Sequence, residues 1–167
     1  MIYRGKAYMN SSLSIIRFLG MKLAIYLAAV LVTYLLASIT ATQSVISNLA
    51  GMGVDVNIAD RLSMTFQDIL GMAGMYLPMV AFALLIAFLV TALICRWLSQ
   101  WRMPLYILAG AVAIVAIHLA LNLAFNLTPI AIARSPGGLM LQALAGAAGA
   151  YVYVFLQNKI KKPQSGE

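Results

Sequence analysis

Residues 103–126 read MPLYILAGAVAIVAIHLALNLAFN, and no side chain in this stretch carries a formal charge. An α-helix needs roughly 20 consecutive apolar residues to cross the hydrocarbon core of a bilayer. The stretch is therefore long enough and apolar enough to predict a membrane-spanning helix.

Three further apolar runs surround this stretch in the sequence, at about 22–42, 71–95 and 138–157. The chain as a whole is 63% hydrophobic and 9% charged, whereas soluble domains are about 45–50% apolar and about 25% charged. These values exclude a cytosolic enzyme, a nucleic-acid-binding domain and a disordered regulator. We predict an all-α integral membrane protein, a bundle of four transmembrane helices.

The distribution of positive charge predicts how the chain crosses the membrane. There are 11 Lys and Arg residues against 4 Asp and Glu. Nine of these cations flank the apolar runs on one predicted side: Arg4, Lys6, Arg17, Lys22, Arg96, Arg102, Lys159, Lys161 and Lys162. Because Lys and Arg hold loops on the cytoplasmic side, we expect both termini to be cytoplasmic, in a topology that suits a bacterial inner membrane. Anionic lipid headgroups are then the expected partners of the basic ends, and nucleic acid is not.

The prediction divides the chain into three parts. Residues 1–21 form a cytoplasmic or interfacial N-terminal segment, 22–157 the four-helix membrane domain, and 158–167 a basic cytoplasmic tail. A basic segment before an apolar run can also be a cleaved signal. The run after Lys22 is long for a signal, so we expect it to remain as an anchor. Cleavage would leave three spans.

The loop between the first two spans has a helical pattern of its own. Asn57 followed by Asp60 resembles a helix N-cap with an acid in the first turn, and apolar residues recur at roughly helical spacing through residues 57–69. We predict a short amphipathic helix on the outer membrane surface. It serves as a linker, or alternatively as a lid or docking surface. The outer side carries the charges Asp55, Asp60, Asp68 and Arg134.

Polar residues inside a span are costly, and each is a candidate for function or for helix–helix bonding. His118, Asn122 and Asn126 are spaced by four in the third span. A step of four drifts by only about 40° around a helix, so the three are expected to share one face. Gln142, in the fourth span, could bond to that face. His118 either fixes packing as a neutral imidazole, contacts a substrate or ion, or couples to protons.

Small residues predict close helix packing in the fourth span. Gly146 and Ala150, like Ala145 and Gly149, are four residues apart, a spacing that lets another helix approach closely. The approaching helix could belong to the same chain or to a second copy.

The sequence contains no arrangement of residues typical of an enzyme. No Asp or Glu lies within the predicted spans, and the single cysteine, Cys95, cannot form a CxxC motif or an internal disulfide. No cofactor or metal site is predicted. We therefore expect a non-enzymatic accessory, assembly or immunity-type membrane subunit that works through helix packing, in a homo-oligomer or a larger complex. The alternative is a small oligomeric transporter or channel lined by His118, Asn122 and Asn126.

Overall fold

The computed structural model describes residues 2–125 and 136–161, with side chains described at 16–123 and 137–160. Two residues of the predicted polar sites, Asn126 and Arg134, lie outside this part of the chain. The end of the basic tail, from residue 162, also lies outside it.

The described chain is helical, with four long helices and one short 3₁₀ turn. The helices are α1 (Ile2–Gly51), α2 (Ile58–Ile94), α3 (Arg102–Phe125) and α4 (Pro136–Lys161), and the turn η1 (Ser99–Trp101) precedes α3. All four helices are long and apolar enough to cross a membrane. This confirms the predicted all-α class, with four apolar helices compatible with a membrane bundle.

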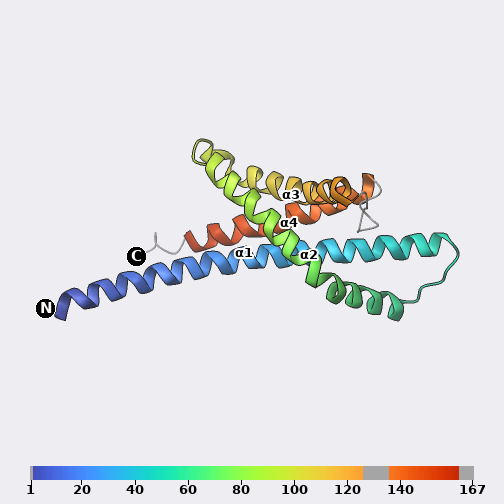
Figure 1. Cartoon of the computed structure of the whole chain (residues 1–167), viewed down its shortest axis with the longest axis horizontal. Coiled ribbons are helices and arrows are strands. Elements are labelled where there is room, and N and C mark those ends of the chain that lie inside the picture. Colours follow the sequence, from blue (N-terminus) through green and yellow to red (C-terminus); the bar gives the residue numbers. More distant parts are fainter. Residues whose placement is uncertain (1, 126–135, 162–167) are drawn as a thin grey trace.

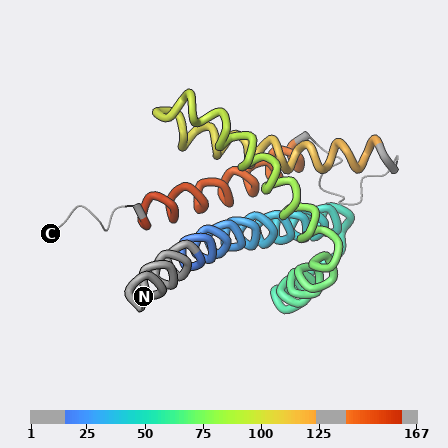
Figure 2. Tube along the Cα trace, turned by 60° about the vertical axis from the view of Figure 1, so that its left-hand side comes forward, coloured from blue at the N-terminus to red at the C-terminus, as the bar shows by residue number. Residues whose placement is uncertain are grey.

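The helices form a ring in which each packs against two others. α4 packs against α1 and α3, and α2 packs against the same two helices. Figure 1 shows α1 along the whole length of the molecule, with α4 beside it in the opposite direction and α2 crossing obliquely. Figure 2 shows the same pairing of α1 with α4, and the first part of α2 lying away from α3 and α4.

Glycines allow α4 to approach its two neighbours closely. A Cβ added at Gly146 would collide with the backbone oxygen of Gly110 in α3 and lie 2.6 Å from Cγ1 of Ile114. A Cβ at Gly149 would meet the Thr33 hydroxyl and lie 2.7 Å from the backbone oxygen of Ala29 in α1. Both distances are too short for real atoms, so these crossings need glycine.

Two helices are longer than the spans predicted for them. α1 has 50 residues and α2 has 37, which at 1.5 Å per residue is about 75 Å and about 55 Å, against a hydrocarbon core of about 30 Å. α1 has no break at Lys22, because the helix already begins at Ile2. Both helices are therefore longer than the hydrocarbon core is thick.

The structure does not contain the predicted short helix as a separate element. Residues 58–69 are helical, but they are the first part of α2. The side chain of Asn57 caps this helix, accepting a hydrogen bond from the backbone N–H of Asp60 at 2.8 Å. The apolar part of α2 contains Pro78, which cannot donate a backbone hydrogen bond, and Figure 1 shows α2 bending along its length.

Candidate polar site inside the bundle

Gln142 joins three helices through its side-chain amide. The residue is fully buried in α4. Its Nε2 donates to the backbone oxygen of Ala37 in α1 at 3.0 Å, and its Oε1 accepts from the hydroxyl of Tyr76 in α2 at 3.2 Å. A buried amide in an apolar interior is costly unless it is paired, so these bonds hold α1, α2 and α4 in one arrangement.

His118 lies next to this junction but bonds within its own helix. The residue is 4% exposed, and its ring meets that of Tyr76 edge-on at 6.0 Å between centroids. Nδ1 lies 2.8 Å from the backbone oxygen of Ile114. Because a carbonyl oxygen only accepts, Nδ1 carries the hydrogen, and Nε2 of the neutral ring is an acceptor. Nε2 has no hydrogen-bond partner among the described residues.

Tyrosines complete the junction between α1 and α2. Tyr34 donates its hydroxyl hydrogen bond to the backbone oxygen of Ile69, and its ring lies 6.2 Å from that of Tyr76. Nearer the basic end of α1, Tyr26 donates to the backbone oxygen of Ala81. We call Tyr34, Tyr76, His118 and Gln142 the buried polar cluster.

Tyr76 was not singled out by the sequence analysis. A tyrosine inside a predicted apolar span could have been noted as a candidate, because a buried tyrosine needs a hydrogen-bond partner for its hydroxyl. The sequence offered no way to identify Gln142, which is 66 positions away, as that partner.

The polar residues predicted to share one face of the third span occupy different environments. His118 is buried, whereas Asn122 is exposed on the surface of the bundle. The neighbouring Leu121 is buried, so the buried face of α3 continues through position 121 instead of 122. Asn126, the third member, lies outside the described residues. His118 and Asn122 therefore do not lie on one buried face of α3.

The charged residues of the predicted outer loop occupy different environments. Asp68 accepts a hydrogen bond from the Thr42 hydroxyl of α1 at 2.8 Å, which ties the start of α2 to α1. Asp55 and Asp60 are exposed. A pairing of any of them with Arg134 stays a prediction, because Arg134 is not described.

The small residues of α4 lie between helices of the same chain. Gly146, Gly149 and Ala150 are all buried, with Gly146 against α3 and Gly149 against α1. A Cβ at Gly110 would lie 2.6 Å from the Cβ of Ala150, which places Ala150 at the same crossing as Gly146. This face of α4 is occupied within the chain.

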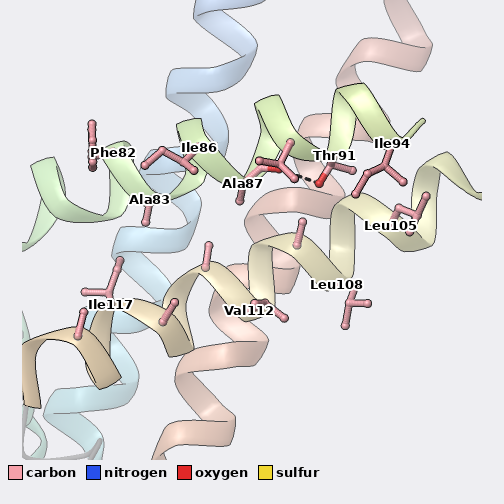
Figure 3. A pocket seen from close by; sticks show the side chains of 15 residues that line it. Phe82, Ala83, Ile86, Ala87, Thr91, Ile94, Leu105, Leu108, Val112 and Ile117 are labelled. Atoms are coloured by element: carbon pink, nitrogen blue, oxygen red, sulfur yellow. Dashed lines mark hydrogen bonds between the residues drawn. The ribbon is translucent and has the colours of Figure 1, made fainter. Parts of the chain in front are cut away.

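A large apolar groove opens between α2 and α3 on the surface of the bundle. Its volume is about 510 Å³. Figure 3 shows the lining side chains coming from both helices, and the Thr91 hydroxyl bonded to the Ala87 backbone oxygen of its own helix. Six alanines line the groove: Ala83, Ala87, Ala109, Ala113, Ala116 and Ala120. No polar group of the groove is left to be satisfied by a ligand.

The described fold is a bundle of four long apolar helices, compatible with a protein that crosses a membrane several times, and it encloses the buried polar cluster. Comparison with protein-family models, curated proteins and solved structures finds no significant match. Among the described residues, no three His, Cys, Asp or Glu side chains are grouped so that they could hold a metal ion.

Proposed function

We propose that this chain is a non-enzymatic membrane subunit, and that the groove between α2 and α3 receives a transmembrane helix of a partner protein. The observation that carries the proposal is the groove itself, an apolar surface with alanines along both walls. The proposed setting is the inner membrane of a bacterium with both termini cytoplasmic, because nine of the cations flank the spans on one side.

The shape and chemistry of the groove favour a helix as its occupant. The lining residues extend from Phe82 to Ile94 in α2 and from Leu105 to Ala120 in α3, about 18 Å and about 22 Å of helix at 1.5 Å per residue. Alanines let a third helix come close to both backbones, and close packing is what holds membrane helices together. A partner helix with large apolar side chains would fill the space over the alanines.

The packing of the interior supports a subunit over a transporter. Gln142 and Tyr76 bond to each other inside the bundle, and His118 bonds to its own helix. A solute path would require these groups to be hydrated.

The first part of α2, which carries Asp60 and Asp68, is proposed to lie on the outer membrane surface.

Photocrosslinking tests whether the groove receives a protein helix. A photoreactive phenylalanine at Ala116, an exposed alanine of the groove, is expected to form one discrete protein adduct in native membranes. Leu119 is the matched control, because it lies in the same helix, is 54% exposed and does not line the groove. It should form no such adduct.

Other adducts would contradict the proposal in distinct ways. If position 116 reacts only with lipid, the groove holds acyl chains and no partner helix. If the adduct has twice the mass of the chain, the occupant is a second copy. Equal protein adducts at positions 116 and 119 would indicate contact without a defined groove.

One observation favours the alternative, a small transporter or channel. Nε2 of His118 and the hydroxyls of Thr33 and Ser38 are buried without a hydrogen-bond partner in the described part of the chain. Buried polar groups are normally paired. An unpaired acceptor at His118 would be free to contact a solute that passes between the helices.

Thiol labelling separates the two functions. In a Cys95→Ser background, we expect the His118→Cys variant to resist a membrane-impermeant maleimide, because the side chain at position 118 is only 4% exposed. The Asp60→Cys variant is the positive control, since Asp60 is exposed near the start of α2, and it should react fully. Reaction at position 118 would instead mean that water reaches the polar cluster, and the transporter would then be the better description.

A further inference from the structure

A small cleft lies between α1, the start of α3 and the end of α4, and none of its lining residues belongs to the polar cluster or to the groove. Its volume is about 260 Å³. It is lined by the N-terminal half of α1, the first residue of α3 and the last turns of α4: Phe18, Met21, Lys22, Ile25, Arg102, Gln157 and Ile160. The four residues from α1 occupy positions i, i+3, i+4 and i+7, so they lie on one face of that helix.

The cleft combines two cations with an apolar wall. Arg102 donates a hydrogen bond to Oε1 of Gln157, and its guanidinium lies 5.9 Å from the centre of the Tyr106 ring. These two contacts hold the guanidinium while leaving other N–H donors for a ligand, since arginine has five. The ammonium of Lys22 lies 4.4 Å from the centre of the Phe18 ring.

No carboxylate neutralises these two cations within the described residues. Asp55 lies in the connection after the far end of α1, and Asp60 and Asp68 lie in the first part of α2. From Lys22 to the end of α1 at Gly51 is about 43 Å along the helix, far beyond a Debye length of about 8 Å at physiological ionic strength. The two cations are therefore available to an anion from outside the described chain.

The apolar residues indicate what kind of anion fits. Phe18 and Met21 are 56% and 46% exposed, and Ile160 is 40% exposed, so apolar surface surrounds the cations. A small inorganic anion would leave that surface uncovered. A phospholipid would cover it with an acyl chain while its phosphate meets Lys22 and Arg102, because guanidinium groups bind phosphate oxygens with good geometry.

We propose that this cleft is a binding site for one anionic phospholipid, with its phosphate between Lys22 and Arg102 and an acyl chain against Phe18, Met21 and Ile160. The site requires only that this end of the bundle lies at a membrane surface. It goes beyond the partner-subunit proposal and does not depend on it.

Native mass spectrometry of the full chain tests the site. The protein is released from micelles containing equal amounts of phosphatidylglycerol and phosphatidylcholine, and the bound lipid is counted. We expect one phosphatidylglycerol to be retained in preference. The Lys22→Gln variant should retain it about five-fold less, the factor expected for one cation near anionic lipid. Lys22 is exposed, so this variant should fold, whereas Arg102→Gln also removes the bond to Gln157.

Lys159→Gln is the matched control. Lys159 also stacks on a phenylalanine, with its ammonium 4.9 Å from the Phe155 ring, but it does not line the cleft. This variant should retain lipid like the unmodified protein. Equal loss in Lys22→Gln and Lys159→Gln would overturn the site in favour of general surface attraction. Equal retention of phosphatidylcholine, or full competition by soluble glycerol phosphate, would also overturn it.

Discussion

Replacing Gly146 with leucine is expected to separate α3 from α4 and to lower the free energy of unfolding by about 3 kcal/mol. The reason is that a Cβ at this position already collides with the backbone oxygen of Gly110. Backbone cannot move aside as a flexible side chain can, so the two helices must move apart. The measurement is unfolding of the purified protein in mixed micelles, followed by circular dichroism.

Gly20→Leu is the control for this substitution. Gly20 lies in α1, and a Cβ there meets no atom within 4 Å. Leucine is a better helix former than glycine, so this variant should be as stable as the unmodified protein or more stable by up to about 1 kcal/mol. If Gly146→Leu and Gly20→Leu had the same stability, the close crossing of α3 and α4 would be wrong.

Replacing Gln142 with leucine is expected to lower the free energy of unfolding by about 2 kcal/mol. The substitution removes the bonds to Ala37 and Tyr76 and leaves the buried Tyr76 hydroxyl unpaired, which costs about 1–3 kcal/mol. Single bonds between membrane helices average about 0.6 kcal/mol, so most of the loss comes from the unpaired groups. The same unfolding assay measures it.

A double-mutant cycle assigns this loss to the bond between the two side chains. Tyr76→Phe alone should destabilise the protein, but it should cost little once Gln142 is leucine, because the hydroxyl no longer has a partner to lose. Asn122→Leu is the polar-to-apolar control, and we expect no loss of stability because Asn122 is exposed. Additive effects of Tyr76→Phe and Gln142→Leu would show that these side chains do not interact.

The sequence predicted the number, type and approximate position of the main helices. This was possible because the hydrocarbon core penalises polar and charged residues along an entire run of about 20 positions. The Asn57 cap could also be predicted, because an N-cap involves only a side chain and a backbone N–H three residues later. Such features depend on composition or on near neighbours in the chain.

Only the tertiary structure decided which face of each helix is buried and what it touches. A helix that is apolar on all sides has little periodicity to mark its inner face, so Asn122 could not be distinguished from His118 by spacing. The partners of Gln142 and of Gly146 depend on how the helices cross, and residues that meet there are far apart in the sequence. Helix crossing is set by the packing of all the side chains together, whereas membrane insertion is largely a property of each segment by itself.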